Sequence, residues 1–378
     1  LDVHVGHAEG RVEIERALAQ VHIQPVFMAH PTEVTRRTLL RKEHNIARHL
    51  VEMMDPYLTP HELEATLGQI RQEMTTGWQT VESLDEGIRL RDEAEHVLFF
   101  LTDVLYRMVP PLYESLESSL ADAFPERGGG VRVPILVQFG TWVGGDMDGN
   151  PHVTAKSIRH TLARQRALVL DLYYRECAEL AAHLSQGLRR VGVSEELKRR
   201  TEQYTGHFPE AAASLPSRHR QMPYRAYLRL VAARLKATYD DHAYPYESPA
   251  ELVADLELLA DTLRANKGRN AGLFAVRRLL RRVRTFGFYL ATVDIRQNAL
   301  VHRRVIGEAL QEPNWLSSDD EQRARRLEEA LERRESPLGA LSSEGRRTLA
   351  VFQTIAHCRR KYGRDSIGPY IVSMPHGP

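Results

Sequence analysis

The chain has 378 residues, 42% of them hydrophobic, and its 51 Lys and Arg balance 50 Asp and Glu, so the formal net charge is +1. This composition is typical of a globular protein with a large core, and the absence of like-charge blocks argues against nucleic acid or a membrane surface as partners. No stretch approaches the roughly 18 apolar residues of a membrane span. The two cysteines, Cys177 and Cys358, lie outside any CxxC or Cys/His cluster. We therefore expect a reduced, cytoplasmic protein without nucleic-acid or membrane partners.

The first predicted strand is the apolar run 23–30, which ends at His30, and a helix is predicted over 33–55. Pro31 suits the first turn of that helix, and Glu33 suits its positive end. A helix start pushes an imidazole toward its neutral form and is a natural anion site. His30 is therefore a candidate general base or oxyanion donor, and a core histidine bonded to backbone is the alternative.

Most of the remaining sequence has the apolar spacing of helices. A leucine stripe at Leu252, Leu256, Leu259 and Leu263 predicts one amphipathic helix. Similar spacing predicts helices over 84–122, 154–188, 223–240, 275–286 and 343–362. The highly charged stretch 312–347 is expected to form short surface helices and loops.

A second strand is predicted within 133–146, and the compact loop "WVGGDMDGNPH" (142–152) follows it. The loop residues expected to support a site are Gly144, Gly145, Asp146, Asp148 and Asn150. The alternative for the two aspartates is that they cap the next helix or pair with nearby arginines. Trp142 is expected either in the core or as the wall of an apolar pocket.

Two familiar binding loops are excluded for this segment. An EF-hand that began at Asp146 would need glycine at its sixth position and glutamate at its twelfth, where this chain has Pro151 and Ser157. A Walker loop would need Gly-Lys-Ser/Thr, which is missing here.

The third and fourth strands are predicted at 288–297 and 369–374. Arg296 leaves the third strand, and its forked guanidinium suits phosphate or carboxylate. A structural ion pair with Asp294 or Glu33 is the alternative. The four strands are separated by long helical stretches, which predicts a predominantly helical α/β fold with parallel strands. The carboxyl ends of parallel strands form one face, so His30, the 142–152 loop and Arg296 are expected to converge there.

These motifs resemble those of phosphoenolpyruvate carboxylase, in the family's order and over essentially the whole chain. They are "AHPTEVTRR" (29–37), "GGDMDGNP" (144–151), "PYR" (223–225), "FGFYLATVDIRQ" (286–297) and "YIVSM" (370–374). The resemblance implies a (β/α)8 TIM-type barrel with many additional helices. Residues 1–378 are then the N-terminal portion of one barrel domain, with about four of the eight strands.

The resemblance also implies an activity. Family members convert phosphoenolpyruvate and bicarbonate to oxaloacetate and phosphate, through carboxyphosphate and the pyruvate enolate, with Mg2+ or Mn2+. His30 matches the catalytic histidine, Arg296 matches an arginine that binds the substrate phosphate, and Trp142 matches a residue that lines the apolar carbon dioxide pocket. Among the arginines after His30, Arg37 is expected to be a further substrate contact.

The sequence departs from the family pattern in two residues and in length. Met28 stands where threonine is usual, and Met147 replaces a common arginine. Family members are more than twice as long, so no metal ligands are expected in this chain, and those for Mg2+ or Mn2+ are expected in a second half. We expect these 378 residues alone to be inactive and the full-length enzyme to be a homotetramer.

Three alternatives remain open from the sequence. The first is a non-catalytic half-barrel that acts as an interaction module, and the second is one chain of a split enzyme. The third is an unrelated barrel lyase that acts on a phosphorylated enol or keto acid.

Overall fold

The computed structural model describes most of the chain, from the first helix to the last strand. The described residues are 11–28, 36–80, 90–125, 131–148, 150, 152–336 and 341–375. His30 lies outside these ranges, so its predicted position next to the site is not described. Among the described residues, no helix is both long enough and apolar enough to cross a membrane.

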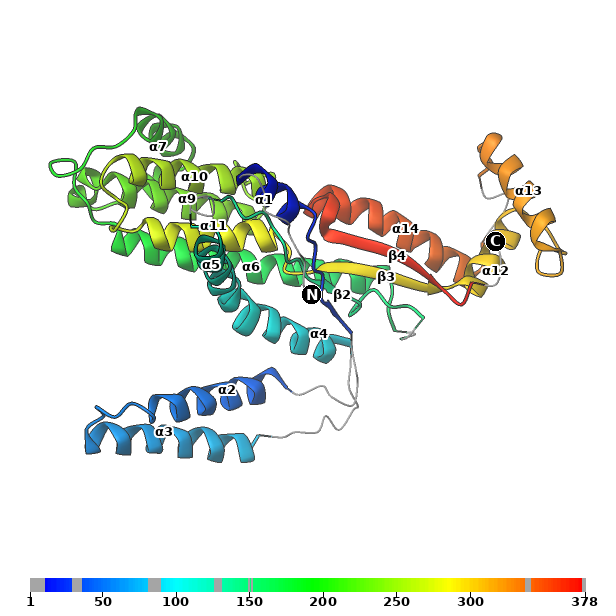
Figure 1. Cartoon of the computed structure of the whole chain (residues 1–378). Coiled ribbons are helices and arrows are strands. Elements are labelled where there is room, and N and C mark those ends of the chain that lie inside the picture. Colours follow the sequence, from blue (N-terminus) through cyan, green and yellow to red (C-terminus); the bar gives the residue numbers. More distant parts are fainter. Residues whose placement is uncertain are drawn as a thin grey trace.

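The described strands form one parallel sheet in the order β1-β2-β3-β4. The strands are β1 (Val26–Phe27), β2 (Gly140–Thr141), β3 (Thr292–Asn298) and β4 (Ile367–Ser373). Strands that follow one another in the chain are neighbours in the sheet, and helical crossovers join them (Figure 1). The predicted helical α/β fold with four parallel strands is confirmed. A partial barrel is consistent with this order, but the half-barrel and the single-domain boundary stay predictions.

β1 and β2 are much shorter than the sequence predicts, with two residues each. Just before β2, backbone N–H groups form hydrogen bonds with a side chain instead of with a neighbouring strand. The backbone N–H groups of Leu136 and Val137 both donate to the Tyr113 hydroxyl, at 2.8 and 3.2 Å. The N–H of Ile23 donates to the Leu136 carbonyl at 2.8 Å. These backbone groups are therefore satisfied without a regular ladder, because a side chain replaces part of the neighbouring strand.

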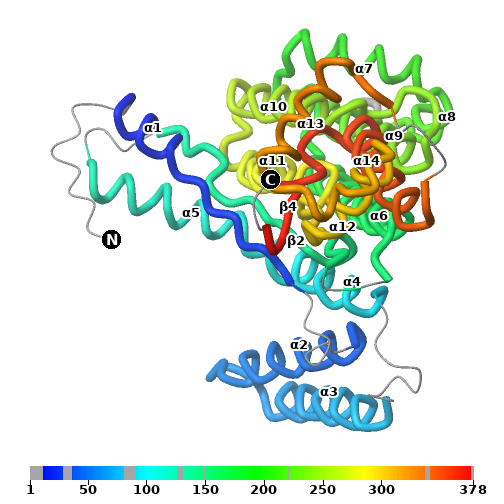
Figure 2. Tube along the Cα trace, turned by 90° about the vertical axis from the view of Figure 1, so that its right-hand side faces the viewer, coloured from blue at the N-terminus to red at the C-terminus, as the bar shows by residue number. Residues whose placement is uncertain are grey.

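Helices make up most of the described chain. The helices that cross between the strands or extend from them are α1 (Arg11–Ala19), α2 (Arg37–Glu52), α3 (Pro60–Trp78), α4 (Leu90–Phe99), the π-helix η2 (Phe100–Leu105), α5 (Tyr106–Ala123), α6 (Ala155–His183), α7 (Glu195–His207), α8 (Pro209–Ala213), the 3-10 helix η3 (Ser217–Gln221), α9 (Pro223–Tyr239), α10 (Pro249–Ala265), α11 (Leu273–Phe286), α12 (Ala299–Ala309), α13 (Asp320–Glu332), α14 (Ser343–Tyr362) and the 3-10 helix η4 (Arg364–Ser366). Each stretch predicted to be helical contains a helix, and the charged stretch 312–347 contains α13. Figures 1 and 2 both show α2 and α3 projecting from the rest of the molecule as a hairpin.

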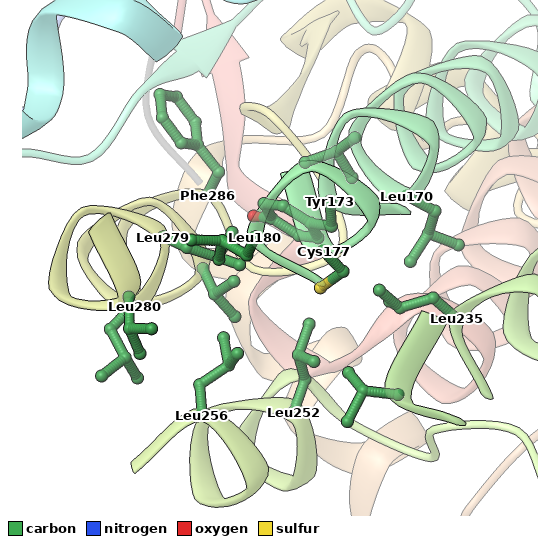
Figure 3. Packing of buried hydrophobic residues seen from close by; sticks show 14 of the residues in the cluster. Leu170, Tyr173, Cys177, Leu180, Leu235, Leu252, Leu256, Leu279, Leu280 and Phe286 are labelled. Carbon is green, nitrogen blue, oxygen red and sulfur yellow. The ribbon is translucent and has the colours of Figure 1, made fainter. Parts of the chain in front are cut away.

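The main core lies between α6, α9, α10 and α11 (Figure 3). Tyr173 and Cys177 of α6, Leu256 of α10 and Leu279 of α11 are fully buried in it. Burial raises the pKa of the Cys177 thiol, so this cysteine remains a protonated apolar group. Cys177 and Cys358 are both buried and free.

A second core cluster covers one face of β3. It joins side chains of α6, β3 and α14, and its members include Ile158, Leu162, Val293, Ile295 and Val351. Successive side chains of a strand point to opposite faces. Val293 and Ile295 therefore face these helices, whereas Asp294 and Arg296 of the same strand face the opposite side, where the polar groups gather.

The predicted helix 84–122 is divided by η2, and two prolines lie inside α5. A proline has no N–H, so the carbonyl group four residues earlier loses its helical donor. For Pro110 that carbonyl belongs to Tyr106, and Arg282 Nε donates to it at 2.9 Å. The arginine of α11 thus replaces the missing hydrogen bond and ties α5 to the main core.

Candidate functional site

The candidate site lies where β2, β3 and β4 end. Trp142 directly follows β2, Arg296 lies in the second half of β3, and Ser373 is the last residue of β4. The loop after β2 continues along β3, because Arg296 N donates to the Gly145 carbonyl at 3.1 Å and Met147 N donates to the Arg296 carbonyl at 2.9 Å. This backbone ladder places the loop side chains next to Arg296, while His30, the third group that was predicted to converge here, lies outside the described residues.

Two glycines allow the loop to lie this close to β3. Gly144 has a φ of 87°, which is in the left-handed region, and an added Cβ there would overlap the Thr161 hydroxyl. At Gly145 an added Cβ would overlap the backbone carbonyl oxygen of Asp294. Both glycines are buried, and both are needed for conformation or close approach. Their predicted role in supporting a site stays a prediction.

Arg296 is held by two carboxylates. Its Nη1 donates to Asp146 Oδ2 at 3.1 Å and its Nη2 donates to Asp148 Oδ2 at 2.8 Å. The guanidinium carbon lies 5.2 Å from the centre of the Trp142 ring, at cation–π distance. The side chain of Arg296 is 26% exposed, and those of Asp146 and Asp148 are 18% and 19% exposed. The arrangement is a partly buried, oriented guanidinium on an aromatic face.

The structure shows which groups pair with Arg296 and with the two aspartates. Asp146 and Asp148 both pair with a nearby arginine, which was one of the alternatives considered for these aspartates. Arg296 forms ion pairs, but with Asp146 and Asp148 rather than with Asp294. The other expected partner, Glu33, lies outside the described residues.

Asp148 has two further donors, which the sequence analysis missed. Asn298 Nδ2 donates to Asp148 Oδ1 at 3.2 Å, and Ser373 Oγ donates to Asp148 Oδ2 at 2.8 Å. Asn298 lies two residues after Arg296 and hence on the same face of β3. Ser373 closes the "YIVSM" motif at the end of β4. The strand periodicity and the rule that polar groups gather at strand ends were signals for both residues.

Asp294 lies beneath this cluster and is 3% exposed. Burial raises the pKa of its carboxyl group, while hydrogen bonds from the Trp142 and Thr292 side chains act in the opposite direction. Gly368 of β4 approaches it so closely that an added Cβ would overlap Asp294 Oδ1. The floor of the site is therefore a tightly enclosed carboxyl group that also contacts the Trp142 ring.

Asn150 shapes the exit of the loop. Its N–H donates to the Asp146 carbonyl at 3.2 Å, and its Oδ1 accepts the N–H of His152 at 2.9 Å. The chain then enters α6, where Thr154 is the N-cap in a capping box. Asn150 thus forms hydrogen bonds on both sides of the loop exit, and its predicted role in supporting a site stays a prediction.

Arg37 makes its hydrogen bonds on other elements. At the start of α2 its Nη1 donates to Glu95 at 3.1 Å, and its Nη2 donates to Thr102 at 2.8 Å and to Asp103 at 3.1 Å. It lines a pocket of about 560 Å³ together with Tyr106 and other residues of η2, α5, α6 and α11. These contacts anchor the α2–α3 hairpin to α4 and η2, and the predicted substrate contact of Arg37 stays a prediction.

The family resemblance implies a divalent metal ion, and we tested whether the side chains fit one. Within the described ranges, His, Cys, Asp and Glu side chains form no group of three or more that could hold a metal ion. Asp146 and Asp148 both bind Arg296, and Asp148 has two more donors. The described residues therefore do not fit a metal ion.

Comparisons with known proteins agree with the motifs. The family model for phosphoenolpyruvate carboxylase matches residues 7–378. The chain is 46% identical over 365 residues to a phosphoenolpyruvate carboxylase of Xanthomonas euvesicatoria pv. vesicatoria, covering 96% of this chain and 40% of the relative. It is 35% identical over 370 residues to the phosphoenolpyruvate carboxylase of Azoarcus sp., covering 93% of this chain and 39% of the relative.

A more distant relative is matched over a similar share of its length. The phosphoenolpyruvate carboxylase of Azorhizobium caulinodans is 32% identical over 397 residues, covering 99% of this chain and 41% of the relative. The chain thus spans about two fifths of the length of these curated relatives. The family match over nearly all its residues, together with the loop and the arginine at the strand ends, shows that the chain belongs to the phosphoenolpyruvate carboxylase family.

Proposed function

We propose that this chain is part of an enzyme that forms oxaloacetate and phosphate from phosphoenolpyruvate and bicarbonate. The observation that carries the proposal is the position of the Arg296 guanidinium at the strand ends. Asp146 and Asp148 orient it, and it lies over the Trp142 ring. A planar guanidinium in a fixed orientation matches the oxygens of a phosphate group. Membership of the family supports the same reaction.

In the proposed reaction, a bicarbonate oxygen attacks the phosphoryl group of phosphoenolpyruvate. This forms carboxyphosphate and releases the enolate of pyruvate. Carboxyphosphate then breaks down to carbon dioxide and phosphate, and the enolate carbon attacks carbon dioxide to give oxaloacetate.

Each predicted site residue has a proposed task in this reaction. Arg296 holds the phosphate of the substrate, and His30 handles carboxyphosphate and its proton. Trp142 provides an apolar wall that keeps water from the enolate, which water would protonate to pyruvate. The loop of Gly144, Gly145 and Asn150 keeps Asp146 and Asp148 against the arginine.

The remaining parts of the proposal concern the longer protein. We propose that further strands complete a TIM-type barrel and that Mg2+ or Mn2+ binds to ligands outside the described residues. The complete enzyme is proposed to be a cytoplasmic homotetramer. Activity is expected from the full-length protein and not from these 378 residues alone.

The test is the replacement Arg296→Gln in the full-length enzyme. Loss of the charged hydrogen bonds is expected to raise the phosphoenolpyruvate concentration at half-maximal rate, by a free-energy cost of ~2–4 kcal/mol. The rate of oxaloacetate formation as a function of phosphoenolpyruvate concentration measures this effect.

The matched control is Arg264→Gln on α10, because Arg264 forms an exposed ion pair with Asp261. This variant is expected to keep the substrate dependence of the parent. If Arg296→Gln also kept it, Arg296 would be a structural ion-pair partner and the proposal for this site would be wrong.

A further inference from the structure

Asp148 connects three separate elements of the site. It lies in the loop after β2 and accepts hydrogen bonds from two residues of β3, Arg296 at 2.8 Å and Asn298 at 3.2 Å. Its third donor is Ser373 at the end of β4, at 2.8 Å. Asn298 and Ser373 are directly paired residues in the β3–β4 ladder. A single carboxylate therefore joins the loop to two neighbouring strand ends.

The two neutral donors restrict how this carboxylate can lie. Arg296 Nη2 and Ser373 Oγ share Oδ2, whereas Asn298 occupies Oδ1. A carboxylate with donors on both oxygens loses its freedom to rotate about its last bond. Because Asp148 is fixed, the guanidinium that it binds is also held in one orientation, which matters for a long side chain with many rotamers.

The donor group of Asn298 is itself oriented by the fold. Asn298 is the N-cap of α12, and its Oδ1 accepts the N–H of Leu300 at 2.9 Å. The amide nitrogen must then point the other way, toward Asp148. The start of α12 thus determines which end of the amide meets the carboxylate.

Joining the two strands is not a sufficient explanation for these contacts. Backbone pairing already holds β3 and β4 together from Val293↔Ile367 to Asn298↔Ser373. The side-chain hydrogen bonds to Asp148 add no partner to that ladder. What they add is the position of a third element, the loop that contacts Arg296.

We propose that Ser373 and Asn298 are positioning residues, which orient the Arg296 guanidinium through Asp148. This inference rests on the proposed function, in which Arg296 binds the phosphate of the substrate. Neither residue is required to touch the substrate. Their effect is on how well the arginine is aligned when the phosphate arrives.

The kinetic experiment uses Ser373→Ala in the full-length enzyme. We expect the KM for phosphoenolpyruvate to rise about tenfold, with a much smaller change in kcat, because the arginine loses its alignment and not its charge. Ser373→Thr keeps the hydroxyl group and is expected to restore the KM of the parent. The matched control is Ser366→Ala in η4, directly before β4, where the serine donates to the Gly363 carbonyl at 2.8 Å. This control is expected to affect stability but not KM.

A second readout does not depend on turnover. Because Arg296 lies on the Trp142 ring, its reorientation is expected to shift the Trp142 emission, obtained as the difference between each variant and its Trp142→Phe counterpart. A shift in Ser373→Ala that is missing in Ser373→Thr and Ser366→Ala supports the positioning role. If Ser373→Ala left both the emission and KM unchanged, the role would be refuted.

The two proposals fail in different ways. If the unmodified full-length enzyme formed no oxaloacetate, the proposed function would be wrong. An active parent whose Ser373→Ala variant had the same KM and emission would overturn only the positioning role. An emission shift with an unchanged KM would support positioning but would contradict phosphate binding by Arg296.

Discussion

At the scale of single residues, Asp294 is the most constrained group of the site. It is 3% exposed and lies against Gly368 and Thr292. Burial raises the pKa of its carboxyl group above the ordinary value of 3.8. The folded chain therefore keeps this proton to a higher pH than the unfolded chain does. Its contribution to stability is complete below the ordinary value and decreases as the pH rises toward the raised one.

The replacement Asp294→Asn tests this effect. Asparagine cannot ionise, so the variant is expected to be more stable than the parent near neutral pH, by about 1 kcal/mol. The difference is expected to decrease as the pH falls from the raised value toward 3.8, the ordinary aspartate value, and to be lost below it. Urea unfolding at several pH values measures it.

The control for this prediction is Asp241→Asn, because Asp241 is 65% exposed and pairs with Lys361. It is expected to change stability by less than about 0.5 kcal/mol at any of these pH values. A difference between Asp294→Asn and the parent that did not vary with pH would show that burial of the charge is not its cause.

At the scale of elements, the close approach of the β2 loop to β3 depends on Gly145. A side chain there would overlap the Asp294 carbonyl oxygen, which is backbone and has little room to move. The ladder from Gly145 to Met147 would have to separate, and with it the contact of Asp146 and Asp148 with Arg296.

Gly145→Ala is therefore expected to lower the free energy of unfolding by about 3 kcal/mol or more. The matched control is Gly68→Ala inside α3, where no atom lies within 4 Å of the added Cβ. Alanine in that helix is expected to be neutral or to stabilise by about 0.5–1 kcal/mol. Urea unfolding compares the two, and equal stabilities would contradict the close approach.

The sequence predicted elements well where side-chain pattern determines them. The β-branched runs identified all four described strands, and polar residues at the ends of two of them identified Arg296 and its loop. The lengths of β1 and β2 were not predictable, because the Tyr113 hydroxyl takes the place of a strand partner. The helix α3 was missed although it has a Thr59–Glu62 capping box and Pro60 at its start.

Inside the site, too, local pattern predicted a residue but not its long-range contacts. Residue type and strand end identified Asp148 as a candidate that supports the loop. Its partners Asn298 and Ser373 come from two different strands, and only the register of β3 with β4 brings them together. Strand periodicity and strand-end position mark each residue as a candidate, but their shared contact depends on register and long-range pairing and has no local signature in the chain.

At the scale of the whole molecule, a buried polar cluster holds the helical part together. The carboxylate of Asp255 on α10 is fully buried. It accepts hydrogen bonds from Arg200 and Tyr204 of α7, both at 2.6 Å, and from Tyr246 at 2.7 Å. Arg234 of α9 lies 3.8 Å from the same carboxylate. Three helices therefore share one negative charge.

Removal of this charge leaves two arginines without their common partner. Asp255→Ala is expected to destabilise the chain by about 3–5 kcal/mol, the usual cost of a buried charge without a partner. Asp261→Asn on the same helix is the control, because Asp261 is 68% exposed and its variant is expected to cost less than about 0.5 kcal/mol. Thermal and urea unfolding measure both, and a mild effect of Asp255→Ala would mean that water replaces the carboxylate.

The pairing of Arg296 with two aspartates has a consequence for how an anion reaches the strand ends. Among the described residues, the two carboxylates and one guanidinium of this cluster carry a formal charge of −1. In the proposed function, the field of this cluster opposes the approach of a phosphate ester, so Arg296 would recognise the shape of an arrived anion instead of attracting it from a distance. Attraction over longer distances then depends on cations elsewhere in the complete site. The ionic-strength dependence of the association rate reports those cations and not Arg296.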